Sequence, residues 1–319
     1  MPRYRRAHPA KTEKPTAMAK LSPAGFRRIE ITDPVQHARI DVALFYPAED
    51  RTAPTPYGPY VIEVASDAPI AANGCPLVVV SHGNGGFPEA HRDLGLHLAR
   101  NGMMAALVRH PGNTTGDNGL AGTIDCLENR PRHLDLVLNA LLADTDIGAH
   151  ADREKIALAG HSLGAYTALA LAGGVPVTSE RETGDASPAA VQVPHRDDIR
   201  ALILMAPATF WYRESEALKA IKAPVFMRTG EKDTITPQWH ADIIRHGLRP
   251  EIPMNDAIVP GAGHFSFMSP FPPERTSPGL PPSQDPLGFD RRAFLRSLND
   301  EIVDNLRNIF DRPASADSL

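Results

Sequence analysis

Cysteine, aromatic residues and long apolar runs are all scarce in this 319-residue chain. The two cysteines, Cys75 and Cys126, form no CxxC pair, which excludes a zinc ribbon and a disulfide-rich secreted scaffold. No run of about 18 apolar residues occurs, so we expect no membrane span. Neither sign of charge is strongly in excess: the chain has 33 Lys and Arg and 38 Asp and Glu, which gives a net charge of −5. This mild acidity argues against nucleic acid as the main partner.

Proline, in contrast, is abundant, with 31 residues gathered in a few loops. Residues 1–20 carry six Lys and Arg, and we interpret them as a mobile basic arm. Residues 21–311 are predicted to form one domain, with inserts near 174–200 and 265–290, and 312–319 a frayed tail. No apolar segment follows the basic residues, so we expect a cytoplasmic protein, or a periplasmic or secreted one if a leader has been removed. The oligomeric state is left open.

Short apolar runs alternate with amphipathic stretches through most of the chain. Residues 76–80 form an unbroken apolar run, typical of a strand covered on both faces, and residues 155–160 (KIALAG) are also predicted to be a strand. A helix with leucines on one face is predicted over 126–143. Residues 26–46 indicate an antiparallel pair, and 50–75 a surface excursion. The fold class is therefore α/β, with a mostly parallel central sheet and helices on both faces.

One pentapeptide carries the sharpest chemical signal. Residues 160–164 read Gly-His-Ser-Leu-Gly, between a predicted strand and a predicted helix. This is the context of a nucleophile elbow, where a tight turn presents Ser162 above the sheet and requires small neighbours. The next backbone N–H, that of Leu163, belongs to the start of the helix.

A serine nucleophile needs a base, and the base needs an acid that orients it. Asp233 and His264 each follow a predicted strand, in the chain order Ser, acid, His that such a sheet requires. We predict Ser162, Asp233 and His264 as a catalytic triad. Glu231 is the alternative acid. The alternative bases are three histidines that come before the expected position: His82, His110 and His161.

The glycine-rich loop after the strand 76–80 is predicted to complete an oxyanion hole. We assign its backbone donor to Asn84, with Gly85 as the competitor, alongside the N–H of Leu163. The remaining candidates are substrate-pocket residues near these motifs: His82, His161, Phe210, Trp211 and Phe265. The proline-rich insert 265–290 is expected to be an ordered loop that shapes the acyl pocket.

Cofactor and metal motifs are not found in the sequence. His91 and His97 are six residues apart on one predicted helix, which does not bring two ligands to one face. No HExxH, P-loop or GxGxxG after a strand occurs, so we expect no metal, nucleotide or other cofactor. Cys75 and Cys126 are predicted to be free thiols, although the sequence alone does not exclude a pair.

Residues from about 26 to 310 resemble the α/β-hydrolase superfamily. Residues 77–86 (LVVVSHGNGG) and 103–117 (MMAALVRHPGNTTGD), with Arg130-Pro131 before the helix 134–142, resemble the bacterial predicted dienelactone hydrolase group, which is related to platelet-activating-factor acetylhydrolases. The resemblance implies the same nucleophile, acid, base and oxyanion donors. Dienelactone hydrolases use a cysteine where this chain has Ser162, so the group does not define the substrate.

These motifs predict a serine hydrolase that cleaves carboxylic esters, including small-molecule or lipid-like ones, through an acyl-enzyme. An alkoxide leaves more easily than an amine, so esters are favoured over amides. An amidase or peptidase-like hydrolase with the same triad, and a non-catalytic binder on the same scaffold, are the alternatives.

Overall fold

A ten-stranded sheet runs through the whole molecule in the computed structural model, which describes residues 22–184 and 187–312. The strand order is β10-β9-β8-β7-β5-β6-β2-β1-β4-β3. Neighbours from β6 through β10 pair in parallel, whereas β2 pairs antiparallel with β1 and β6. The strands are β1 (Ala24–Asp33), β2 (Ala38–Pro47), β3 (Ala53–Tyr57), β4 (Tyr60–Ser66), β5 (Cys75–Ser81), β6 (Met104–Val108), β7 (Ala151–His161), β8 (Ile199–Met205), β9 (Val225–Gly230) and β10 (Met254–Val259).

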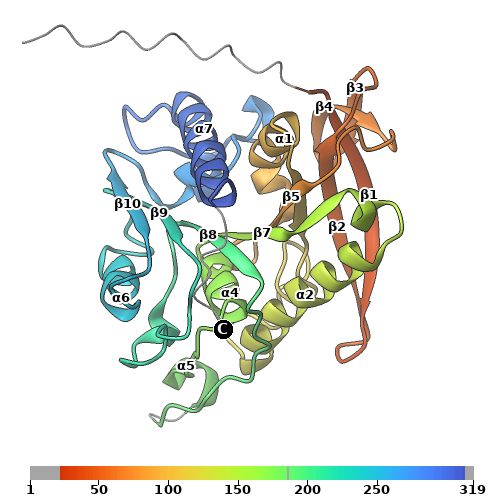
Figure 1. Cartoon of the computed structure of the whole chain (residues 1–319). Helices are drawn as coiled ribbons and strands as arrows, with labels where there is room; N and C mark the ends of the chain where they lie inside the picture. The colour runs from red at the N-terminus through yellow and green to blue at the C-terminus, as the bar shows by residue number, and fades with distance from the viewer. Residues whose placement is uncertain (1–21, 185–186, 313–319) are drawn as a thin grey trace, which may run out of the picture.

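Helices cover both faces of this sheet (Figure 1). Helices α1 and α7 pack against each other on one face, and α2 and α4 do so on the other. The α-helices are α1 (Arg92–Arg100), α2 (Ile124–Ala143), α3 (Ile147–His150), α4 (Leu163–Leu171), α5 (Glu180–Thr183), α6 (Trp239–Gly247) and α7 (Arg291–Phe310). Short 3-10 turns are η1 (Pro88–His91), η2 (Phe210–Tyr212), η3 (His264–Phe267), η4 (Pro273–Arg275) and η5 (Pro281–Ser283).

The central strands separate two apolar cores. Val79 of β5 packs into the core under α2 and α4, while Val78 and Val80 pack into the core under α1 and α7. Because alternate side chains of a strand point to opposite faces, a strand buried on both sides is apolar at every position. The unbroken run at 76–80 predicted this arrangement, and the parallel, doubly covered sheet is confirmed.

The prediction for residues 50–75 was wrong, because they include the antiparallel hairpin β3–β4 at the edge of the sheet. Pro54 and Pro56 obscured β3, but an edge strand tolerates proline because one side of it donates no ladder hydrogen bonds. In β4, Tyr60, Ile62 and Val64 are buried and alternate with exposed residues, which is the period of a half-buried strand.

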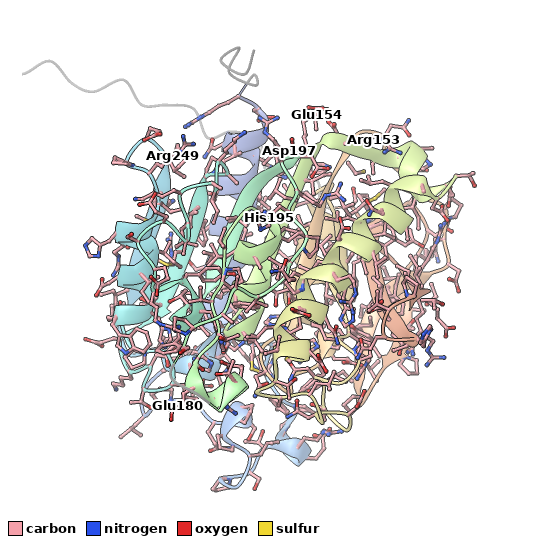
Figure 2. The ribbon with its side chains drawn as sticks, turned by 90° about the horizontal axis from the view of Figure 1, so that it is seen from below. Arg153, Glu154, Glu180, His195, Asp197 and Arg249 are labelled. Atoms are coloured by element: carbon pink, nitrogen blue, oxygen red, sulfur yellow. The ribbon has the colours of Figure 1, made fainter. Side chains whose placement is uncertain are left out.

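The two ends of the parallel strands lie at opposite ends of the molecule. Arg153 and Glu154, near the start of β7, lie at one end, and Glu180 of α5 lies at the other (Figure 2). The insert 174–200 thus begins at the carboxyl ends of the strands, where ligands bind in such sheets, and returns to their amino ends, where Asp197 precedes β8 (Figure 2). The predicted arm 1–20 and residues 313–319 of the predicted tail lie outside the described residues. No helix in the described ranges is both long and apolar enough to cross a bilayer.

Candidate active site

Ser162 lies at the sharp turn between β7 and α4, with φ 55° and ψ −120°. A positive φ is uncommon for a residue with a side chain, and it persists only where the surrounding structure enforces it. A Cβ on Gly160 would lie 2.2 Å from the Gly164 carbonyl oxygen, and one on Gly164 would lie 2.0 Å from the carbonyl oxygen of Ser81. The two glycines are therefore required by close backbone approach, as the pentapeptide predicts.

Asp233 and His264 meet at the carboxyl ends of β9 and β10. The Nδ1 atom of His264 lies 2.8 Å from Oδ2 of Asp233. Oδ1 of Asp233 accepts the backbone N–H groups of Ile235 and Thr236, and Oδ2 accepts the Thr236 hydroxyl at 2.7 Å. Burial by itself would raise the pKa of Asp233, but the contact with His264 and the bonds from Thr236 outweigh burial and lower it. Asp233 is thus held as a carboxylate that faces the imidazole.

Glu231, the alternative acid, is exposed and accepts the N–H of Gly261 at 2.8 Å instead. Helix α6 begins at Trp239, so Thr236, which precedes Pro237, does not lie at its start. Thr236 bonds to Asp233 and to the backbone carbonyl of Ala206 instead of capping a helix.

His161 links the elbow to the loop that carries His264. Its Nε2 lies 2.9 Å from the backbone carbonyl oxygen of His264, so Nε2 carries the proton and donates it. The two imidazole centroids are 4.9 Å apart. Burial, together with the neighbouring His264, moves the pKa of His161 well below its ordinary value. His161 is therefore a neutral donor that joins the neighbour of Ser162 to the backbone of His264.

The glycine-rich loop after β5 lies directly against Ser162. A Cβ on Gly83 would lie 3.2 Å from Cβ of Ser162, and Gly85 has a positive φ of 59°. The side chain of Asn84 is fixed by the amide of Asn113, which donates to Asn84 Oδ1 at 2.8 Å. The loop thus brings the backbone of Asn84 to the same corner as the first residue of α4.

Arg130 contacts this loop and its neighbours, and the sequence analysis assigned no chemical role to it. Its guanidinium is fully buried and donates to four neutral acceptors: Oγ1 of Thr167 at 3.0 Å, Oδ1 of Asn113 at 2.6 Å, Oγ of Ser81 at 3.0 Å and the backbone carbonyl of His82. Within the described residues Arg130 has no ion pair with a carboxylate. Burial lowers its pKa to about 10, so it remains charged at neutral pH.

A chain of hydrogen bonds leads from Arg130 to a buried carboxylate. Ser81 Oγ lies 2.9 Å from Nε2 of His110, whose Nδ1 lies 3.1 Å from Nδ1 of His133. His133 Nε2 lies 2.9 Å from Oε1 of Gln36 and 3.3 Å from Oδ2 of Asp33, so both oxygens face the same N–H. Because a carboxylate only accepts, we assign the protons so that every bond points from the cation toward Asp33. Burial lowers the pKa of His133 to about 3, and burial beside Arg130 lowers that of His110, so both imidazoles are neutral.

Replacing Arg130 with methionine is expected to lower the free energy of unfolding by about 3–5 kcal/mol, because four buried acceptors lose their donor. It should also lower kcat for any reaction at Ser162, because the loop with Asn84 loses its support. Arg130→Lys keeps the charge but cannot reach all four acceptors, so it should recover stability more than kcat. Denaturant titration and steady-state kinetics measure the two effects. Unchanged kcat in a folded Arg130→Met variant would show that the loop is held without Arg130.

Two cavities meet at Ser162 and Asn84. The Phe271 cavity, of about 680 Å³, is also lined by Tyr60, His91, Arg109, His264 and Phe271. The Trp211 cavity, of about 440 Å³, is also lined by Leu127, Leu163, Phe210, Trp211 and Trp239.

Each predicted pocket residue lines one of these cavities. His82, His161 and Phe265 line the Phe271 cavity, and Phe210 and Trp211 line the Trp211 cavity. The insert 265–290 contributes several walls to the Phe271 cavity, including Phe271 and Leu280.

The structure contains no disulfide among its described residues, since Cys75 and Cys126 are both buried free thiols. Burial raises the pKa of Cys75 to about 11, so this thiol is not a nucleophile at neutral pH. Across residues 22–184 and 187–312, no group of three or more His, Cys, Asp or Glu side chains could hold a metal ion.

Comparison with known proteins gives a fold but no family. No family model matches the chain, and no curated protein matches it in sequence. Among solved structures, it is similar to a ferulic acid esterase from Streptomyces cinnamoneus, with a TM-score of 0.67 and 19% sequence identity over 96% of each chain. With its mostly parallel sheet and doubly covered faces, the protein has an α/β-hydrolase fold.

Proposed function

We propose that this protein is a serine hydrolase that cleaves carboxylic esters through an acyl-enzyme. The observation that carries the proposal is the strained backbone of Ser162 beside a histidine that is oriented by a carboxylate. His161, the residue before Ser162, bonds to the backbone carbonyl of His264, and the ring of His264 contacts Asp233. A serine held at positive φ, in a cavity that it shares with a carboxylate-oriented imidazole, fits an activated nucleophile.

In the proposed reaction, His264 takes the Ser162 hydroxyl proton as Oγ attacks the ester carbonyl. Asp233 holds Nδ1 of His264 and stabilises the imidazolium that forms. The N–H groups of Leu163 and Asn84 stabilise the oxyanion, and each such donor contributes about 3–4 kcal/mol. The alcohol leaves with the proton from His264. Water activated by the same imidazole then releases the acid and restores Ser162.

Esters with a planar or aromatic acyl group are the first substrates to test. The similar structure is a ferulic acid esterase, and the Trp211 cavity has flat aromatic walls. The resemblance to dienelactone hydrolases and platelet-activating-factor acetylhydrolases adds lactones and short-chain phospholipid esters to the panel. Matched anilides test the amidase alternative, which requires turnover that rivals that of the esters.

A fluorophosphonate probe tests the nucleophile without knowledge of the substrate. We expect one covalent adduct, located by peptide mass spectrometry on Ser162, together with loss of ester turnover in proportion to labelling. An adduct on another residue would contradict the assignment of the nucleophile. A protein that neither reacts with the probe nor hydrolyses any ester would favour the non-catalytic binder.

A further inference from the structure

We propose that the two cavities divide the ester between them, with the alcohol in the Phe271 cavity and the acyl group in the Trp211 cavity. This inference rests on the proposed function. Ser162 and Asn84 line both cavities, so a tetrahedral carbon bonded to Ser162 can project one substituent into each. His264 lines the Phe271 cavity, and Leu163 lines the Trp211 cavity. The proposed base thus lines one cavity, and the proposed oxyanion donor Leu163 lines the other.

Proton transfer determines which substituent belongs to which side. When the tetrahedral intermediate collapses, the bond from carbon to the alcohol oxygen breaks, and that oxygen takes the proton from Nε2 of His264. The leaving oxygen must therefore lie within hydrogen-bond distance of His264, and the alcohol behind it extends into the cavity that His264 lines. With the carbonyl oxygen in the oxyanion hole, the acyl substituent is left to extend along Leu163 into the other cavity.

The Phe271 cavity suits a bulky alcohol with an apolar ring. The Phe271 ring lies 6.1 Å from that of Phe87 and 6.3 Å from that of Tyr60, both at nearly perpendicular angles. Arg109 and Glu89 also line this cavity and form a loose ion pair with Nη2 to Oε1 at 3.3 Å. The walls thus combine an aromatic cluster with charged groups.

His91 adds a specific polar group to this cavity. Its side chain is buried, with 3% of the residue exposed, and its Nε2 has no hydrogen-bond partner among the described residues. Burial lowers the pKa of His91 to about 4, so the ring is neutral and each nitrogen is a donor or an acceptor according to the tautomer. Because an unpartnered buried nitrogen is costly, we assign it to a second oxygen of the alcohol, such as a hydroxyl.

The Trp211 cavity suits a planar acyl group. The Trp211 ring is fixed by a hydrogen bond from its Nε1 to Glu182 at 3.2 Å and by the Tyr166 ring at 5.0 Å. Trp239 and Phe210 meet edge to face at 6.2 Å and are partly exposed. A rigid indole on one side and an aromatic rim on the other favour a flat ring or a conjugated chain over a branched group.

The test exploits the fact that esters with one acyl group and different alcohols pass through the same acyl-enzyme. We compare two matched aromatic truncations, Phe271→Ala and Trp239→Ala, on an alcohol series at constant acyl group and on an acyl series at constant alcohol. Phe271→Ala should change kcat/KM at least tenfold across the alcohol series, while the deacylation rate constant stays within twofold of wild type. Trp239→Ala should change selectivity across the acyl series together with the deacylation rate.

His91→Leu tests the polar assignment separately. It should lower kcat/KM about tenfold for alcohols that carry a second hydroxyl and leave that of the deoxy analogues within twofold. Equal loss for both kinds of alcohol would overturn the assignment to His91. The division of the ester is overturned if Phe271→Ala changes deacylation, if Trp239→Ala acts on the alcohol series, or if both variants act equally on both series. Absence of ester turnover and of fluorophosphonate labelling in the wild type would instead refute the proposed function itself.

Discussion

Replacing Ser162 with alanine is expected to reduce kcat for ester hydrolysis by about 10⁶-fold, which is the scale on which a triad nucleophile acts. Alanine keeps the Cβ that the elbow already accommodates at φ 55°, so the fold should not change. Steady-state kinetics on the best ester of the panel, with circular dichroism as a check on folding, measure the effect. The matched control is Ser215→Ala on the exposed surface, which should keep wild-type kcat.

The double variant makes this prediction more stringent. Ser162→Ala combined with His264→Ala should be no slower than the more impaired single variant, because neither residue acts without the other. Asp233→Asn should cost about 10⁴-fold, because the amide no longer favours the tautomer that His264 needs. Multiplicative losses in the double variant would mean that Ser162 and His264 contribute independently, which contradicts a shared proton transfer.

The elbow and the strands were predictable because their signals are local. Gly160 and Gly164 are dictated by backbone atoms a few ångströms away, and the apolar run at 76–80 follows from burial on both faces. The chain order of the motifs then brings Asp233 and His264 to neighbouring strand ends. The chain order favours Asp233 over Glu231 as the acid; in the structure Asp233 Oδ2 lies 2.8 Å from His264 Nδ1, whereas Glu231 accepts the N–H of Gly261.

The support beneath the loop was not predictable in the same way, because its partners are far apart in the chain. Arg130 bonds to residues 17 to 49 positions away, and nothing local reveals those contacts. One signal was available in the sequence: Arg130 lies between Leu127 and Leu134 on the buried face of α2. A charged residue is rarely buried unless polar groups pair with it, so its position indicates buried partners. The division of the site into two cavities also depends on side chains from distant loops, so only the structure could show it.

Acid is expected to unfold this protein well above the pH at which carboxylates titrate. Six buried histidines have pKa values below the ordinary 6.5, chiefly because burial disfavours the charged ring: His82, His91, His110, His133, His161 and His240. Well above pH 6.5 neither the folded nor the unfolded chain protonates them, and stability is complete. Below pH 6.5 the unfolded chain binds protons that the folded chain refuses, so the free energy of unfolding falls as pH falls.

Each such histidine costs about 1.4 kcal/mol per pH unit below 6.5 until its folded-state pKa is reached. Six together cost roughly 8 kcal/mol per unit, which is comparable to the whole stability of an ordinary domain. The urea midpoint should therefore fall only slightly from pH 8 to 7 and should fall steeply between 6.5 and 5.

Proton uptake on unfolding at pH 5.5 provides the direct measurement; these six rings should contribute between about five and six protons, and His97, whose pKa burial also lowers, adds to them. His240→Asn is the matched variant, because an amide oxygen can still accept the Thr209 N–H that Nδ1 of His240 accepts at 3.0 Å. It should lower the uptake by about one proton. A midpoint that does not change between pH 8 and 5.5 would mean that these rings protonate freely in the folded protein. That result would remove the basis for treating His91, His161 and the pair of His110 and His133 as neutral.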